Sequence, residues 1–173
     1  MLALINDLLD LRSLDAARPE IAPIDLEPII FETMGLMRSL IDEKSLAMTI
    51  NIAPGLPLVL AERRAVVQIL INLISNAAKF TPSGGSVVLE AQRTSSRVHV
   101  SVRDTGIGIA LEDQKKLFTY FEQVGDKHAH HMQGSGVGLA LTRALVERQG
   151  GAITVRSAIG VGSTFDFHLP MAS

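Results

Sequence analysis

The strongest hydrophobic pattern in the chain lies in residues 66–80, which read VVQILINLISNAAKF. Apolar side chains fill most of this stretch, and polar ones recur at Gln68, Asn72, Asn76 and Lys79. A helix turns about 100° per residue, so Asn76 and Lys79 lie within about 40° and 20° of Asn72. The pattern therefore predicts a helix with one polar stripe, whose other faces pack in a core.

The polar stripe has two interpretations. A solvent-exposed face is the usual meaning of such a stripe on an amphipathic helix. A buried amide without a hydrogen-bond partner costs about 1–3 kcal/mol, so two amides and a cation on one stripe also favour a polar ligand. Amide oxygens suit Mg²⁺, which shares phosphate oxygens and water, and a nearby lysine adds a positive charge for those phosphates. The helix alone leaves both interpretations open.

The chain before this helix predicts two further helices and two strands. Leucines recur through residues 2–15 at helical spacing, on a wide apolar side that needs a partner. Pro19 and Pro23 indicate a linker, and Asp25 is a suitable N-cap for a helix that continues to about Glu43. The expected strands are 46–52 and 58–60.

The chain after the helix alternates strands with short helices. The expected strands are 87–92, 98–103, 153–157 and 164–169, and the expected helices are 111–117 and 139–149. Residues 122–133 are polar and lack periodicity, which predicts a mobile loop. Helices mixed with antiparallel hairpins favour an α+β fold, in which a sheet carries helices on one face. At 173 residues, the chain has room for one well-packed domain and a short extension.

Composition excludes several classes of function. The chain has no cysteine, which excludes disulfides, thiolate metal sites and a cysteine nucleophile. Its formal net charge is −2, so its overall charge attracts neither nucleic acid nor an acidic membrane. No apolar run reaches the roughly 18 residues of a membrane span, and the start of the chain lacks the basic region of a signal peptide. We therefore expect a cytoplasmic chain that contacts neither nucleic acid nor membrane.

Two glycine motifs are candidate binding segments. Asp104-x-Gly106-x-Gly108 ends an expected strand; its glycines allow close approach of a ligand, and its aspartate can accept a hydrogen bond from an exocyclic amine. Gly134-x-Gly136-x-Gly138 opens an expected helix, whose free N–H groups favour phosphate. An ordinary Asp-Gly turn and a flexible hinge are the respective alternatives. The second motif is neither the dinucleotide fingerprint nor a P-loop.

The histidines fall into two groups. His128, His130 and His131 lie in the expected loop, where a metal site is one interpretation. No cysteine or obvious fourth ligand accompanies them, which favours a solvated loop whose charge rises below neutral pH. His99 and His168 fall in expected strands, and we expect both to be partly buried structural residues.

The motifs taken in order resemble a known family. NLISNAAKFT, DTGIGI, LFTYF, GSGVGLAL and GSTFDFHLP resemble the N, G1, F and G2 boxes of bacterial sensor histidine kinases, over about residues 25–170. The opening LINDLLDLRSLDA resembles the end of the second helix of that family's dimerisation domain. The resemblance implies the Bergerat (GHKL) fold: a two-layer sandwich of a mixed, mostly antiparallel sheet with three helices on one face, preceded by an N-terminal helix. It also implies that residues 1–18 form the C-terminal part of a dimerisation helix, that 19–24 form a linker, and that 25–173 form the ATP-binding catalytic domain.

The resemblance implies a role for each matching residue in binding ATP and Mg²⁺. Asn76 would ligate Mg²⁺ beside Asn72, Lys79 would contact phosphate, and Asp104 would bind the adenine amino group. Supporting positions would be Gly106, Gly108, Phe118, Phe121, Gly134, Gly136, Gly138, Leu139 and Thr164. Of these, the two phenylalanines would pack under a lid of residues 122–135, the glycines from 134 on would wrap the phosphates, and Thr164 would support the base near Asp104. We expect the lid to be poorly ordered without nucleotide.

The same resemblance favours phosphoryl transfer over hydrolysis. Related ATPases place a glutamate base where this chain has Asn72, and an amide cannot take a proton from water. None of the five histidines is followed by an acid, so the phosphoacceptor is expected on a dimerisation domain that would precede Met1, with a response regulator downstream. Gln123 stands where many members carry an arginine, for which Lys127 is the candidate substitute. A degenerate nucleotide-binding module and a GHKL ATPase are the alternatives.

Overall fold

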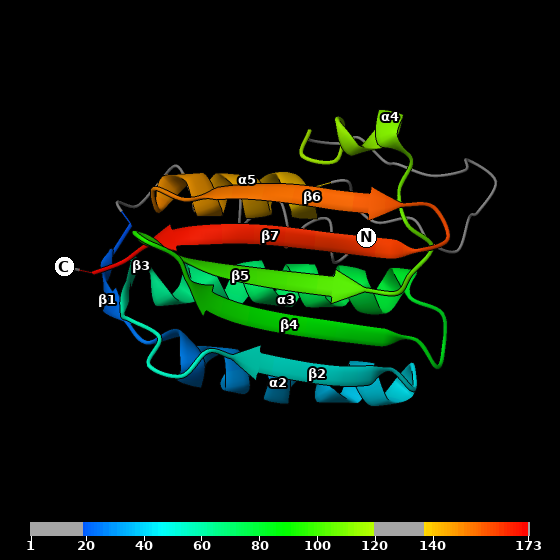
Figure 1. Ribbon diagram of the computed structural model, residues 1–173, viewed down its shortest axis with the longest axis horizontal. Coiled ribbons are helices and arrows are strands. Elements are labelled where there is room, and N and C mark those ends of the chain that lie inside the picture. The colour runs from blue at the N-terminus through cyan, green and yellow to red at the C-terminus, as the bar shows by residue number, and fades with distance from the viewer. Residues whose placement is uncertain (1–18, 120–136, 173) are drawn as a thin grey trace.

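A computed structural model describes residues 19–119 and 137–172, and its centre is a five-stranded sheet with strand order β2-β4-β5-β7-β6 (Figure 1). The strands are β2 (Ala47–Ile52), β4 (Ser86–Arg93), β5 (Arg97–Asp104), β7 (Gly162–Pro170) and β6 (Ala152–Ala158). β2 pairs with β4 in parallel, whereas the other neighbours are antiparallel. The prediction of a mixed, mostly antiparallel sheet is confirmed.

Three described helices cover one face of this sheet, so the predicted two layers are confirmed as well (Figure 1). They are α2 (Leu26–Glu43), α3 (Arg63–Phe80) and α5 (Gly138–Arg148). The short α4 (Leu111–Gln114) lies beside β6, apart from this layer. The helix expected over 2–15 lies outside the described residues.

A small second sheet corrects the predicted linker. β1 (Ala22–Ile24) pairs antiparallel with β3 (Val59–Ala61), so Pro23 lies opposite Leu60 in the body of the domain. The interpretation of residues 19–24 as a linker is therefore wrong for 22–24. Proline is tolerated here because a two-stranded sheet leaves one edge of β1 without a partner strand.

Local sequence explains where the helices begin and what they bury. The Asp25 carboxylate accepts a hydrogen bond from the backbone N–H of Glu27 at 3.0 Å and so caps α2, as predicted. α3 is the central helix, packed between α2 and α5. Its buried side chains are Ala65, Val66, Ile69, Leu70, Leu73, Ile74, Ala77 and Ala78. Strand alternation directs Val98, Val100 and Val102 of β5 into the same core.

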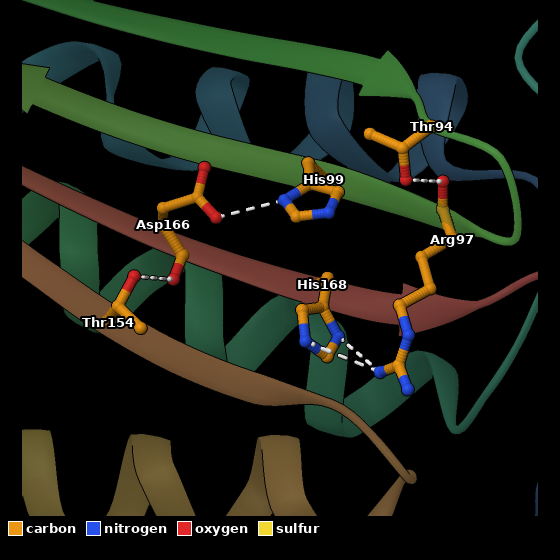
Figure 2. A network of polar contacts seen from close by, with 6 residues as sticks. All are labelled: Thr94, Arg97, His99, Thr154, Asp166 and His168. Carbon is orange, nitrogen blue, oxygen red and sulfur yellow. Dashed lines mark hydrogen bonds and ion pairs between the residues drawn. The ribbon is translucent and has the colours of Figure 1, made fainter.

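The sheet face away from the helices is polar. His99 on β5 lies opposite His168 on β7, with ring centroids 5.3 Å apart (Figure 2). Asp166 Oδ1 lies 3.0 Å from His99 Nδ1, and Arg97 Nη1 donates to His168 Nδ1 at 2.8 Å. Burial and the adjacent Arg97 charge lower the pKa of His168. Both histidines are half-buried strand residues, as expected.

Within the described residues, no helix combines the length and the hydropathy that a bilayer span requires.

Candidate nucleotide-binding site

Asp104 is a buried carboxylate at the end of β5. Its Oδ1 accepts the backbone N–H of Gly106 at 2.8 Å and that of Ser163 at 3.3 Å. Burial raises the pKa of Asp104, and these two hydrogen bonds oppose the rise. An aspartate held in this way is a strong acceptor for a ligand N–H group.

The two glycines after Asp104 pack against the protein itself. A Cβ at Gly106 would lie 2.6 Å from Phe80 O and 2.7 Å from Asp104 Oδ1. Gly108 has φ +73°, and a Cβ there would overlap the carbonyl oxygen of Ala158. These glycines hold the turn against α3 and the β6–β7 corner, and thereby position Asp104. From the sequence, we expected these glycines instead to let a ligand approach the backbone closely.

Ser163, rather than Thr164, lies beside Asp104. Register pairs Asp104 with Ser163 and Arg103 with Thr164, and successive side chains on a strand point to opposite faces. Ser163 is buried with Asp104, whereas Thr164 lies on the face away from the helices. The prediction that the Thr164 side chain supports the base near Asp104 is therefore wrong.

The polar stripe of α3 meets the start of α5 at Asn72. Asn72 Nδ2 donates to Gly138 O and, at 2.6 Å, to Thr142 Oγ1. A Cβ at Gly138 would lie 2.7 Å from Asn72 Oδ1 and 3.0 Å from Nδ2, so a larger residue there would force the Asn72 carboxamide to shift. This contact places the beginning of α5 against the middle of α3.

The rest of the stripe runs from Asn72 toward the Asp104 turn. Asn76 and Lys79 are half-buried, and burial lowers the pKa of Lys79. Lys79 Nζ lies 5.0 Å from the centroid of the Phe80 ring. Phe80 O accepts the N–H of Ile107 at 3.2 Å, so the Asp104 turn adjoins the C-terminal end of α3. At 1.5 Å per residue, Asn72 and Phe80 are separated by about 12 Å along the helix, with Asn76 and Lys79 between them.

Two further predicted residues lie on the core side of the site. Phe118 packs edge-to-face on Phe165 of β7, with centroids 6.4 Å apart and planes at 86°. Leu139, in the first turn of α5, is half-buried against the core. The predicted residues outside the described chain are Phe121, Gly134, Gly136 and those of the lid, and the histidines at 128, 130 and 131 lie there too.

Two residues of this arrangement were missed by the sequence interpretation. Thr142 follows Gly138 by four residues, so helical spacing was the signal that the two share a face of α5. Ser163 could have been found by strand parity, because Phe165 and Phe167 are the apolar residues that set the inward face. Neither signal identifies the partner, which comes from a distant segment.

The residues present fit a magnesium nucleotide. Amide oxygens on the stripe are neutral hard ligands, Lys79 is a cation for phosphate, and Asp104 is a buried acceptor at the far end. The stripe is half-buried rather than fully exposed, which agrees with a ligand-binding face more than with an ordinary solvated one.

Comparison with known proteins identifies the family. The family described as histidine kinase-, DNA gyrase B-, and HSP90-like ATPase matches residues 61–173. The chain is 40% identical to the non-motile and phage-resistance protein of Caulobacter vibrioides, over 99% of this chain and 21% of that protein. It is 37% identical to the histidine protein kinase DivJ of the same organism, over 99% of this chain and 29% of DivJ.

A solved structure agrees with these relatives. The full-length structure of ShkA in complex with AMPPNP superposes with a TM-score of 0.85 at 35% identity, covering 99% of this chain and 36% of that chain. The present chain thus spans 21% to 36% of the length of these three proteins. The chain belongs to the histidine kinase-, DNA gyrase B-, and HSP90-like ATPase family, and within it to the ATP-binding catalytic domains of histidine kinases.

Proposed function

We propose that this chain binds Mg²⁺-ATP and donates the γ-phosphoryl group to a histidine on a dimerisation domain. The observation that carries the proposal is how the Asn72 side chain is held. Its carboxamide is held by hydrogen bonds to α5 at the position where related ATPases use a carboxylate base. Because an amide cannot accept a proton from water, the site favours transfer to a nucleophile presented to it.

The described residues would bind different parts of the nucleotide at the two ends of the site. Asn76 would ligate Mg²⁺ beside Asn72, and Lys79 would contact the phosphates. Asp104 would accept the adenine amino N–H, with Ser163 and Gly106 holding its carboxylate. When bound, Mg²⁺ supplies positive charge that neutralises the transferring phosphoryl group. Lys79 adds a second positive charge from the protein itself.

The proposed partners follow from the same chemistry. The acceptor would be the histidine-bearing dimerisation domain of the parent kinase, which in turn would phosphorylate a response regulator. An ATP-dependent kinase works where ATP is present, so we place the chain in the cytoplasm. Nucleic acid and membrane have no part in the proposal.

Labelling with γ-³²P-ATP tests the transfer. The chain alone is expected to acquire no stable label, and the dimerisation domain of the parent, added in trans, is expected to acquire acid-labile label. A domain whose acceptor histidine is replaced by glutamine is the control. Stable label on a histidine of this chain would contradict the proposal.

Two measurements separate the alternatives. Steady phosphate release well above background and abolished by Asn72→Ala would indicate an ATPase. Nucleotide binding that is unchanged by Asp104→Asn would indicate a degenerate module that does not use the proposed adenine site.

A further inference from the structure

We propose that Thr142 is a positioning residue that fixes which end of the Asn72 carboxamide faces the nucleotide. Thr142 is fully buried in α5. Its Oγ1 donates to Gly138 O at 2.9 Å and lies 2.6 Å from Asn72 Nδ2, which also contacts Gly138 O. Three polar groups from two helices thus meet in one small cluster.

The donors and acceptors around Asn72 determine the orientation of its amide. A backbone carbonyl such as Gly138 O can only accept, so the group of Asn72 that faces it must be the NH₂. The Thr142 hydroxyl uses its single proton on Gly138 O, which leaves a lone pair for Asn72. The two N–H bonds of the amide then have one acceptor each, and no donor among the described residues contacts Oδ1.

This orientation selects an amide at position 72. A carboxylate in the same place would present only acceptors to Gly138 O and to the occupied Thr142 hydroxyl, which is unfavourable. The pair Gly138 and Thr142 therefore disfavours the ionised acid that a hydrolytic ATPase would need. Because Asn72 Oδ1 has no donor among the described residues, it would be available to accept from, or ligate, the bound Mg²⁺-nucleotide. This last step rests on the proposed function, whereas the orientation of the amide does not.

A matched control separates this role from ordinary helix packing. Thr33 in α2 is also fully buried, and its Oγ1 donates to Ile29 O, four residues earlier, at 2.8 Å. Thr142 makes the same type of bond to Gly138 O and, in addition, accepts from Asn72. Thr33→Val and Thr142→Val therefore remove the same local bond, but only the second removes the partner of Asn72.

Titration calorimetry on the full chain with Mg²⁺-AMPPNP tests the positioning role. Loss of one net hydrogen bond predicts that Thr142→Val weakens binding about three- to ten-fold. Thr142→Ser, which keeps the hydroxyl, and Thr33→Val are expected to stay within about twofold of wild type. In the Asn72→Ala background, Thr142→Val is expected to cause no further loss. A full loss in that background, or wild-type affinity of Thr142→Val alone, would overturn the inference.

A second measurement needs no nucleotide. In ¹⁵N-correlated spectra, the side-chain NH₂ signals of Asn72 are those that vanish in Asn72→Ala. They are expected to shift in Thr142→Val and to stay in place in Thr33→Val. Unmoved signals would refute the inference even if the chain bound nucleotide. Conversely, if these signals shift in Thr142→Val but the wild-type chain binds no nucleotide, the orientation of the amide stands and the proposed function is rejected.

Discussion

At the scale of single residues, the site depends on where charge is buried. Asp104 is ionisable, buried and close to two backbone N–H groups, and burial is the larger effect on its pKa. A raised folded-state pKa means that the stability contributed by Asp104 is complete below the usual aspartate pKa and is lost as pH rises through the raised value. The carboxylate therefore opposes folding at neutral pH, where the proposed function would use it as the acceptor for adenine.

Asp104→Asn separates these two effects. The asparagine Oδ1 can still accept from Gly106 and Ser163, while the buried charge is gone. Relative to wild type, the variant is expected to gain stability as pH rises from below the usual aspartate pKa to neutral, as measured by urea unfolding. Its NH₂ would face the adenine amino group, donor against donor, so calorimetry should show nucleotide binding at least about tenfold weaker. A stability difference that does not change with pH would contradict the buried-charge argument.

Ser163 and Thr164 offer a neighbouring pair for a second test. Thr164→Val changes a side chain on the face away from Asp104, so the nucleotide dissociation constant is expected to stay within about twofold. Ser163→Val adds bulk to a buried position beside Asp104, and overpacking of about 1–3 kcal/mol predicts both lower stability and weaker binding. Equal effects of the two variants on binding would show that the strand register is not what separates their roles.

At the scale of elements, hydrogen bonds between described residues join α3 and α5 near both ends of α5. Asn72 contacts the first turn of α5, and Gln149 at the end of α5 contacts the start of α3. The buried Gln149 accepts the backbone N–H of Glu62 at 2.8 Å and donates to Leu145 O at 3.0 Å. Glu62 makes no side-chain cap of its own, so Gln149 supplies an acceptor that the α3 N-terminus lacks locally.

Gln149→Leu is therefore expected to destabilise the fold by about 1–3 kcal/mol, because a backbone N–H loses its partner. Chemical denaturation measures this difference. Gln92→Leu makes the same chemical change at an exposed position of β4 and is expected to shift stability by no more than about 0.5 kcal/mol. Equal effects of the two variants would refute the cap supplied by α5.

At the scale of the whole molecule, the proposed nucleotide site joins segments that lie far apart in the chain. The site combines the stripe of α3, the end of β5 and the start of α5, all on the helical side of the sheet. The opposite face carries a polar network that includes His99, Asp166 and His168 (Figure 2). A ligand that contacts several segments at once stabilises all of them together against unfolding.

Thermal unfolding with nucleotide should reveal this coupling. At a nucleotide concentration a hundred times the dissociation constant, mass action adds about 2.7 kcal/mol of stability. For a domain of this size, that predicts a rise in Tm of roughly 5–10 °C. Removing Mg²⁺ with EDTA is expected to abolish most of the rise, and Asp104→Asn, with binding at least about tenfold weaker, should reduce it to about half or less. A rise that is independent of Mg²⁺ would contradict the proposed metal site on the stripe.

The sequence by itself determined the features that follow from local periodicity. Helical pitch places Asn72, Asn76 and Lys79 on one stripe, and Asp25 caps α2 by a bond to a residue two positions away. Strand alternation and turn residues predicted the sheet strands, since each depends on neighbours in the chain. These features need no knowledge of what lies across the core.

Only the tertiary structure decided the partners between distant segments. Thr142 reaches Asn72 across 70 positions, and the register of β5 with β7 places Ser163 rather than Thr164 beside Asp104. The strand at 22–24 was missed because β3, its only partner in the small sheet, begins at Val59. Such contacts depend on how the layers pack and on register, where a shift of one residue reverses every side chain.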